Sequence, residues 1–364
     1  MIKIQSPGRI CLFGEHQDYL NLPVIAMAIS RYIYLEAERI SSPQFIIELP
    51  DLDETLEISL NNRELEYDSK RDYLKSGYNL FLRKGIKFNK GYKIKITGDI
   101  PINAGVASSS ALVIAWLYFL NQISNETINK KSNLAIEGYN TEVKEFNEAG
   151  GMMDHYSSIY GNLIYLEPKF PRPNFISINE KIDGFVLGNS LEKKDTVENL
   201  MKVKNLALNA FKTLKEILPT FDQYKTSLEE VKPFLPNLEK KYQKKVVGNL
   251  INRDITVKAK KLIFEDYPYE DTKVKDFYQQ LGNLLNMHHI QLKNNIGIYT
   301  EKIELMVKKC LESGALGAKI NGSGFGGTMF ALSIPGNEIP LKNAIEEAEG
   351  KAYMIKASNG VEKY

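Results

Sequence analysis

The clearest pattern in the chain is a strand-like segment and a helix-like segment joined by a run of small residues. Polar and apolar residues alternate over residues 91–98, as in a half-buried strand, and residues 111–120 are apolar enough for a buried helix. The connection, residues 101–110, reads Pro-Ile-Asn-Ala-Gly-Val-Ala-Ser-Ser-Ser. The sequence therefore predicts a small-residue loop that ends where a helix begins.

This loop is a candidate phosphate site. The first turn of a helix leaves backbone N–H groups without partners, and the aligned peptide dipoles place partial positive charge there. Small side chains keep that backbone open to an anion. The predicted phosphate-binding residues are Gly105, Val106, Ala107, Ser108, Ser109 and Ser110. The Gly-Lys-Ser/Thr ending of a P-loop is missing, so a different nucleotide-binding family is required.

The serines have a second interpretation. Serine is a common helix cap, and a small-residue loop alone is compatible with a simple capped turn. Three consecutive serines exceed what one cap requires. We therefore expect one hydroxyl to cap the helix and another to face a metal ion or a phosphate.

Further apolar patterns predict strands and helices along the rest of the chain. Strands are predicted at residues 161–167, 185–188 and 328–333, and long helices at residues 197–217 and 276–293. Three prolines in residues 168–174 interrupt any periodicity and predict a domain boundary. We therefore predict an N-terminal domain at residues 1–172 and a C-terminal α+β domain at residues 173–364.

Composition and charge exclude several classes of protein. The chain has 364 residues and a formal net charge of +2, so nothing in the charge balance favours nucleic acid or an anionic membrane surface as a partner. It has no charged-then-apolar leader pattern and no apolar run long enough to span a bilayer, which predicts a cytoplasmic protein. Cys11 and Cys310 lie far apart in apolar surroundings, which favours reduced core residues over a disulfide or a metal site.

A polar cluster near the N-terminus is the second candidate site. Glu15, His16 and Asp18 lie within four positions of one another. Carboxylates and an imidazole supply the oriented acceptors and donors that the hydroxyls of a sugar need. Arg9 follows Pro-Gly, and its permanently charged guanidinium is suited to stabilise a phosphoryl group during transfer. The alternative is an ordinary surface turn with solvated charges.

Three segments together resemble the GHMP small-molecule kinases, the group of galactokinase, homoserine kinase, mevalonate kinase and phosphomevalonate kinase. These are residues 6–23, residues 101–111 and the glycine-rich residues 317–331, in the order that the family has them. Gly-Glu-His-Gln-Asp-Tyr at residues 14–19 is similar to the galactokinase branch. The resemblance implies an α+β, two-domain GHMP kinase fold. Its parts are an N-terminal ribosomal protein S5 domain 2-like α/β domain and a C-terminal ferredoxin-like α+β domain, with the active site in the cleft between them.

The resemblance also implies an activity and its ligands. A galactokinase-like enzyme transfers a phosphoryl group from ATP, with Mg²⁺, to a sugar hydroxyl, and we expect the anomeric hydroxyl. Galactose stands first among several sugars and uronic acids. A mevalonate-type or heptose-phosphate-type GHMP kinase and a catalytically silent, sugar-sensing regulator are the alternatives. The expected partners are ATP and a small sugar, with the protein as a monomer or homodimer.

A fourth segment implies the catalytic residue. Residues 149–155, Ala-Gly-Gly-Met-Met-Asp-His, resemble the galactokinase stretch that ends Gly-x-Met-Asp-Gln, with His155 in place of the glutamine. The resemblance implies that Asp154 is the catalytic aspartate, as a true base or as an orienting group, with Arg9 as its partner. The residues implied to contact the sugar are Glu15, His16, Asp18, Gly151 and Asp154. Without the resemblance, Asp154 suits a helix N-cap or a solvated side chain equally well.

Mg²⁺ binds hard oxygen ligands, usually one or two protein groups together with substrate phosphates and water. The resemblance implies Ser110 and Glu142 as these ligands. Glu145 and Glu148 are the competitors, because their three-residue spacing puts them in the same helix neighbourhood as Glu142.

The glycine-rich segment near the C-terminus is not predicted to bind a dinucleotide. Its glycines are Gly322, Gly324, Gly326 and Gly327. A dinucleotide fingerprint opens a βαβ unit, whereas these glycines precede a strand-like segment near the end of the chain. In a kinase of this family they let the backbone approach the active centre and support the phosphate loop.

Overall fold

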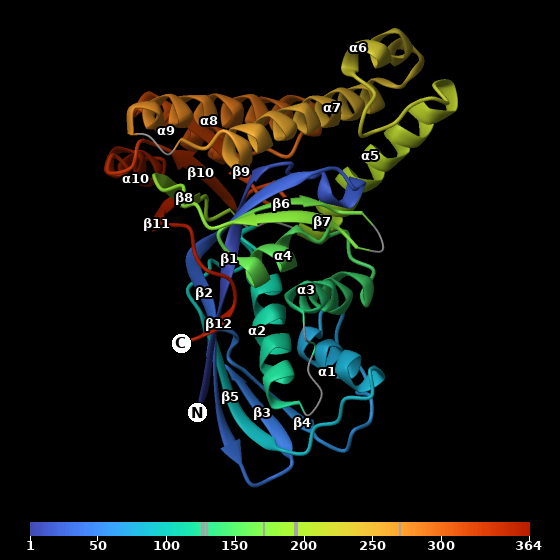
Figure 1. The fold of residues 1–364 in the computed structure, drawn as a ribbon, viewed down its shortest axis with the longest axis vertical. Helices are drawn as coiled ribbons and strands as arrows, with labels where there is room; N and C mark the ends of the chain where they lie inside the picture. Colours follow the sequence, from blue (N-terminus) through green and yellow to red (C-terminus); the bar gives the residue numbers. More distant parts are fainter. Residues whose placement is uncertain (125–127, 129, 170–171, 193–195, 269–270) are drawn as a thin grey trace.

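The structure is a computed structural model that describes residues 1–124, 128, 130–169, 172–192, 196–268 and 271–364. The chain forms two β-sheets with helices packed on them (Figure 1). The strands are β1 (Ile2–Phe13), β2 (Val24–Ile40), β3 (Gln44–Leu49), β4 (Glu54–Ser59), β5 (Gly91–Gly98), β6 (Leu163–Glu167), β7 (Asn174–Ile178), β8 (Phe185–Asn189), β9 (Gly317–Asn321), β10 (Thr328–Leu332), β11 (Lys351–Ile355) and β12 (Glu362–Lys363).

The helices of the described residues fall into three kinds. The α-helices are α1 (Tyr73–Arg83), α2 (Ser108–Ile123), α3 (Lys131–Tyr139), α4 (Met153–Tyr160), α5 (Thr196–Ile217), α6 (Leu228–Val231), α7 (Lys240–Lys260), α8 (Asp271–Gln291), α9 (Glu301–Glu312) and α10 (Ile339–Glu347). The 3₁₀ turns are η1 (Asp18–Leu20), η2 (Pro50–Leu52) and η4 (Lys232–Asn237). The π turns are η3 (Asn140–Lys144), η5 (Lys261–Glu265) and η6 (Leu292–Ile296).

The larger sheet contains strands from both ends of the chain. Its order is β12-β1-β2-β5-β3-β4, with β6 paired to β2 and β7 paired to β6. Neighbouring strands are antiparallel except β3 and β5. Helices α1 to α4 lie on one side of this sheet (Figure 1). Their apolar side chains form the first core with the strands, as where Trp116 packs against Phe45 with ring centroids 5.7 Å apart.

The smaller sheet has the order β11-β8-β10-β9, and every pair is antiparallel. Helices connect β8 to β9 and β10 to β11, so the chain follows the β-α-β-β-α-β path of a ferredoxin-like domain, as expected. Side chains alternate between the two faces of β8. Phe185 and Leu187 belong to the core shared with α8 and β1, whereas Val186 packs with α9 and α10.

Most predicted elements are present. The strand predicted at residues 91–98 is β5, and the helix predicted at residues 111–120 lies inside α2. The long helices predicted at residues 197–217 and 276–293 match α5 and α8 with its π turn η6. The larger sheet extends past the proline segment through β7 and takes up β12 from the end of the chain. The boundary between residues 172 and 173 stays a prediction, and residues 170–171 of that segment lie outside the described residues.

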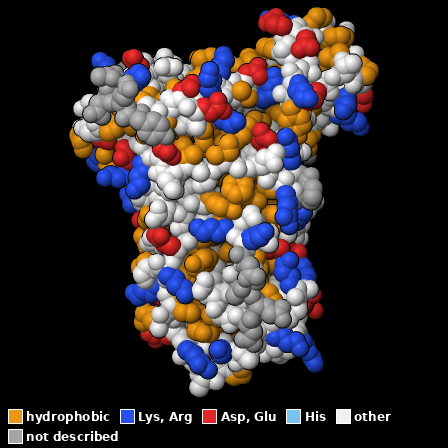
Figure 2. All heavy atoms as spheres, viewed as in Figure 1, with side chains coloured by type: hydrophobic (Ala, Val, Ile, Leu, Met, Phe, Trp, Pro, Cys, Tyr) orange, Lys and Arg blue, Asp and Glu red, His pale blue; other side chains and the backbone are white. Residues whose placement is uncertain are grey.

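The described surface and thiols add two observations. No helix among the described residues is both long enough and apolar enough to cross a membrane. On the face in Figure 2, acidic and basic side chains are interspersed over the upper, helical end. Cys11 and Cys310 are free, buried thiols, in agreement with the prediction of reduced core residues.

Candidate active site

A cavity lies where the two sheets meet, and both halves of the chain line it. Its walls come from β1 and the loop after it, the loop before α2, the π turn η3, the start of α4 and the loop after β9. The predicted site residues that line it are Arg9, Glu15, His16, Asp18, Gly105, Ala107, Ser108, Ser109, Ser110, Glu142, Gly151, Asp154 and Gly322. Val106, Gly324, Gly326 and Gly327 do not line the described cavity.

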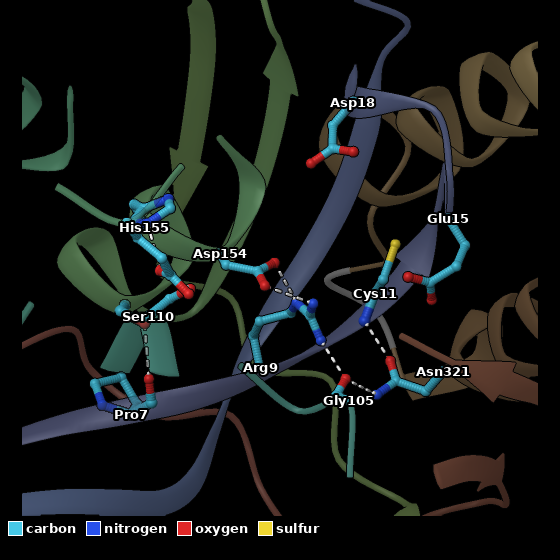
Figure 3. Close-up of polar contacts among 12 residues, drawn as sticks. Pro7, Arg9, Cys11, Glu15, Asp18, Gly105, Ser110, Asp154, His155 and Asn321 are labelled. Carbon is cyan, nitrogen blue, oxygen red and sulfur yellow. Dashed lines mark hydrogen bonds and ion pairs between the residues drawn. The ribbon is translucent and has the colours of Figure 1, made fainter. Parts of the chain in front are cut away.

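Arg9 and Asp154 form the centre of the site (Figure 3). Arg9 donates from Nε and Nη2 to the two carboxylate oxygens of Asp154, at 2.7 and 2.8 Å, and from Nη1 to the carbonyl of Gly105 at 2.7 Å. Burial opposes the charge of Arg9, but the nearby carboxylates of Asp154 and Glu15 keep its pKa above the usual value. The guanidinium thereby holds the Asp154 carboxylate in one orientation.

The phosphate loop is held against β1. Arg9 donates its backbone N–H to the carbonyl of Val106 at 3.1 Å, and a Cβ on Gly8 would lie only 2.6 Å from that same oxygen. Gly105 and Ala107 have φ of 86° and 62°, so the loop uses the left-handed region twice before α2 begins at Ser108.

The expected serine cap is absent. The N-cap residue of α2 is Ala107, which has no side-chain capping hydrogen bond. The prediction of a serine cap was therefore wrong, because the left-handed turn at Ala107 puts an alanine at the capping position. The first backbone N–H groups of α2 keep their capacity to bind an anion, which is what a phosphate site needs.

Ser110 and Glu142 are in direct contact. Ser110 donates its hydroxyl to Oε2 of Glu142 at 2.6 Å, and Nε2 of His155 lies 2.7 Å from the same oxygen. Burial alone would raise the pKa of Glu142, but hydrogen bonds with His155, Ser109 and Ser110 lower it overall. The site thus offers a hydroxyl and an ionised carboxylate side by side.

The two competing glutamates have other contacts. Glu145 accepts hydrogen bonds from Arg83 and from the hydroxyl of Tyr67 and does not line the cavity. Glu148 lines the cavity and is bound by Arg71. Glu142 lies within the π-helical turn η3, whereas Glu145 and Glu148 follow it. Metal binding by Ser110 and Glu142 stays a prediction.

Glu15 and His16 are buried in the loop after β1. Lys319 on β9 is fully buried, and its ammonium lies 3.4 Å from Oε2 of Glu15 and donates to the carbonyl of Cys11 at 2.7 Å. Burial raises the pKa of Glu15, although Lys319 and Arg9 pull it downwards. His16 contacts the hydroxyl of Tyr19 at 2.9 Å through Nδ1.

Asp18 is a further carboxylate of the cavity, and its surroundings raise its pKa. Burial, followed by repulsion from Asp154, raises the pKa of Asp18 from 3.8 to about 6. A Cβ on Gly151 would lie 2.1 Å from Oδ2 of Asp18, so only glycine permits this approach. The next residues of the loop, Leu20 and Leu22, are buried in a core with α5 and α7, which fixes the position of Asp18.

The glycine-rich loop supports the phosphate loop from the other domain. A Cβ on Gly322 (φ 76°) would lie 2.5 Å from the carbonyl oxygen of Gly105. The adjacent Asn321 donates from Nδ2 to that carbonyl at 3.0 Å and accepts the backbone N–H of Cys11 at 2.8 Å (Figure 3). Gly324 has a different function, because a Cβ there would lie 2.3 Å from the carbonyl of Ile298.

Sequence reasoning missed Asn321, Lys319 and Arg71. The first two carried a detectable signal, because a lysine and an asparagine alternate with apolar residues in a strand that is buried throughout. A buried polar side chain needs a partner, so both predict contacts across the domain interface. Arg71 gave no such signal, because it is a charged residue outside a buried strand and its partner Glu148 is 77 positions away.

Comparison with known proteins agrees with this geometry. Residues 72–162 match the GHMP kinase N-terminal domain, residues 274–352 match the GHMP kinase C-terminal domain, and residues 2–39 match the galactokinase galactose-binding signature. A galactokinase of Pyrococcus furiosus is 28% identical over 372 residues, covering 99% of both chains. A mevalonate kinase of the same organism is 27% identical over 361 residues, covering 97% of this chain and 95% of the relative.

Solved structures have the same fold. The crystal structure of Lactococcus lactis galactokinase with galactose superposes with a TM-score of 0.85 at 21% identity, covering all of this chain and 95% of that one. The Methanococcus jannaschii mevalonate kinase superposes with a TM-score of 0.70 at 19% identity, covering 98% of each chain. With the matched N-terminal, C-terminal and sugar-binding segments in the expected order, this chain belongs to the GHMP kinase family.

Proposed function

We propose that this protein transfers the γ-phosphoryl group of ATP to a monosaccharide hydroxyl, with galactose as the first candidate and its anomeric hydroxyl as the acceptor. The observation that carries the proposal is the Arg9–Asp154 pair, which lies in one cavity with the serine loop and with the acidic loop of Glu15 and Asp18. Full-length similarity to galactokinases and the galactose-binding signature at residues 2–39 support it.

In the proposed mechanism, Asp154 accepts the proton of the attacking sugar hydroxyl, whose oxygen then attacks the γ-phosphorus as the bond to ADP breaks. Arg9 orients the Asp154 carboxylate and stabilises charge on the transferring group. The open N–H groups at the start of α2 bind the phosphates. Positioning supplies most of the rate in such reactions, because the protein performs little covalent chemistry itself.

Ser110 and Glu142 suit Mg²⁺, because they present two adjacent hard oxygens and the carboxylate is kept ionised. The ion would neutralise phosphate charge when it is bound with the nucleotide. His155 orients Glu142 through Nε2. Because the reaction consumes ATP, we expect the protein to act in the cytoplasm. We also expect it to be a monomer or a homodimer.

The cavity disfavours an acidic substrate. A mevalonate-type kinase needs a cation for the carboxylate of its substrate, but the Arg and Lys residues among the described lining residues are only Arg9 and Arg71. Arg9 is already held by Asp154 and by the carbonyl of Gly105, which leaves Arg71, paired with Glu148, as the single described lining guanidinium open to an anion. Near-equal identity to mevalonate kinases keeps that activity as the second candidate.

The product distinguishes these possibilities. We would incubate the protein with ATP, Mg²⁺ and galactose and follow the phosphorus NMR signals. The proposal predicts a sugar phosphate whose phosphorus couples to the anomeric proton. Coupling to another proton would show that a different hydroxyl of the sugar is the acceptor. Bound ATP without any sugar phosphate would favour the sugar-sensing regulator.

A further inference from the structure

The charge of the cavity leaves a problem for nucleotide binding. Among the described residues, five carboxylates line it: Glu15, Asp18, Glu142, Glu148 and Asp154. One lining guanidinium, Arg9, is already occupied by Asp154 and the Gly105 carbonyl. A polyphosphate entering this space is repelled unless cations compensate, and the phosphate loop contains no lysine to do so.

Arg71 is the remaining lining guanidinium. It lies just before α1 and donates from Nε and Nη2 to the two carboxylate oxygens of Glu148, at 2.9 and 3.1 Å. The hydroxyl of Tyr73 donates to Oε1 of Glu148 at 2.9 Å and so holds this carboxylate from a second direction. The side chain of Arg71 is 43% exposed, so the fork is accessible from the cavity mouth.

Arg71 also lies near the phosphate-binding side of the cavity. It lines the same cavity as Ser110 at the start of α2 and Glu142, which accepts the Ser110 hydroxyl. The side chain of Arg71 is 43% exposed and that of Glu148 is 17% exposed, so solvent partly screens the pair and reduces its contribution to stability. A planar fork that matches carboxylate geometry also matches phosphate geometry.

We infer that Arg71 is a phosphate-binding residue for the nucleoside diphosphate or triphosphate, and that Glu148 holds its guanidinium in place until the nucleotide's phosphate oxygens replace the carboxylate. This inference rests on the proposed function and adds a residue to it. Glu148 is then a positioning residue and a competitor. No proton or bond is transferred in the exchange, because one anionic partner of Arg71 replaces another.

The chain supplies a matched control in Arg83. It makes the same kind of forked contact with Glu145 and Glu64, its side chain is 42% exposed, and it does not line the cavity. We would measure Mg-ADP affinity by calorimetry and adenosine affinity by competition with ADP, for the wild type, Arg71→Ala, Arg71→Lys and Arg83→Ala.

Arg71→Ala should weaken ADP binding about tenfold or more while leaving adenosine affinity within about twofold, because only the phosphate contact is lost. Arg71→Lys should retain part of the ADP affinity that Arg71 contributes, since lysine keeps the positive charge but lacks the forked guanidinium. Arg83→Ala should change neither. An Arg71→Ala protein that binds ADP as the wild type does, or that loses ADP and adenosine equally, would overturn the inference.

Glu148→Gln provides a second, independent readout. Removing the competing charge should tighten ADP binding about threefold, whereas Glu145→Gln should leave it unchanged. If the Arg71–Glu148 pair were purely structural, Glu148→Gln would instead lower the unfolding temperature and leave ADP affinity the same. These binding measurements need no sugar turnover, so failure of the galactose assay would refute the proposed function while leaving this test valid.

Discussion

The two sides of the cavity differ in what they contribute. The side formed by the first part of the chain carries charged groups, with Arg9, Asp154 and Glu142 facing the cavity. The side formed by the smaller sheet contributes supports instead. Asn321 and Gly322 hold the Gly105 carbonyl in place, and Lys319 binds the loop that carries Glu15.

The two domains have different roles at the cavity. Chemistry needs charged groups that a substrate can reach, so these residues line the cavity. Supports need close backbone approach and full burial, so they appear as a glycine with positive φ and as polar residues in a buried strand. Substitutions on the first side should abolish phosphoryl transfer. Substitutions on the second side should weaken nucleotide binding or slow the reaction without abolishing it.

The largest expected effect is at Asp154. Asp154→Ala should lower kcat by roughly 1000-fold, because it removes the group that accepts the hydroxyl proton. ADP affinity should stay within about twofold of the wild type, since the phosphate loop is untouched. Steady-state kinetics and calorimetry check both values.

The control for this change is Asp99→Ala, which removes a carboxylate that pairs with Arg31 outside the cavity. It should leave kcat unaltered. Turnover by Asp154→Ala at the wild-type rate would show that the charged side does not perform the reaction.

Next in size is the effect of Gly322→Ala. The new Cβ would lie 2.5 Å from the Gly105 carbonyl at a backbone φ of 76°, so the phosphate loop must move. We expect kcat/KM for ATP to fall about 100-fold, because displacements on the order of 1 Å in a site have that effect. Kinetics at varied ATP concentration measure the loss.

Gly336→Ala separates backbone strain from loop displacement. Gly336 has a φ of 94°, but nothing lies within 4 Å of a Cβ there. It should cost about 1 kcal/mol of stability through strain and leave kcat/KM intact. If kcat/KM fell equally in Gly322→Ala and Gly336→Ala, Gly322 would not position the phosphate loop.

A smaller effect is expected at Asn321, the support that joins the domains. Asn321→Ala leaves the buried N–H of Cys11 without its acceptor, which should cost about 1–3 kcal/mol in the free energy of unfolding. It also frees the Gly105 carbonyl from one donor, so ADP affinity should fall several-fold. Chemical denaturation and calorimetry measure the two quantities.

Asn286 makes the same pair of contacts inside one domain. Its Nδ2 donates to Leu316 and its Oδ1 accepts from Ala318. Asn286→Ala should therefore lose similar stability while keeping ADP affinity. If Asn321→Ala destabilised the protein without weakening ADP binding, the side formed by the smaller sheet would stabilise the fold but would not position the phosphate loop.

The smallest effect concerns the pH dependence of stability. The raised pKa of Asp18, about 6 in the folded protein, means that its contribution is fully present below the ordinary value near 4 and is lost as pH rises through about 6. Asp18→Asn should therefore increase the free energy of unfolding by roughly 1 kcal/mol at pH 8 and flatten its slope between about pH 4 and 6. Denaturation at several pH values checks this.

The control here is Asp222→Asn. The Asp222 carboxylate accepts the backbone N–H of Tyr224, as the Asp18 carboxylate accepts that of Tyr19, but Asp222 does not line the cavity. It should leave the slope unaltered. A slope that persists in Asp18→Asn would mean that Asp18 is not the carboxylate whose ionisation is opposed by burial.

The sequence predicted the charged side better than the supporting side. Arg9 and Glu15 belong to a short motif in which local residue type indicates their chemistry, whereas the role of Asp154 was implied by the family resemblance. The serine cap was wrong because the left-handed conformation of Ala107 depends on packing of the loop against β1. Backbone conformation of this kind is set by distant contacts.

The supporting contacts join residues that are far apart in the chain. Asn321 and Gly105 are 216 positions apart, and Lys319 and Glu15 are 304 apart. No local pattern pairs such residues, although polar side chains in an otherwise apolar strand indicate that partners must exist. β12 is similar, since its place beside β1 depends on the whole chain and not on its own two residues.

The activity proposed for this cavity is phosphorylation of a neutral sugar. It is tested most directly by ATP- and Mg²⁺-dependent ADP release across free hexoses, pentoses, amino sugars, uronic acids and mevalonate. The account predicts turnover with a neutral sugar, galactose first, and none with mevalonate. Turnover with mevalonate alone, or silence across the panel while ATP is bound, would contradict it.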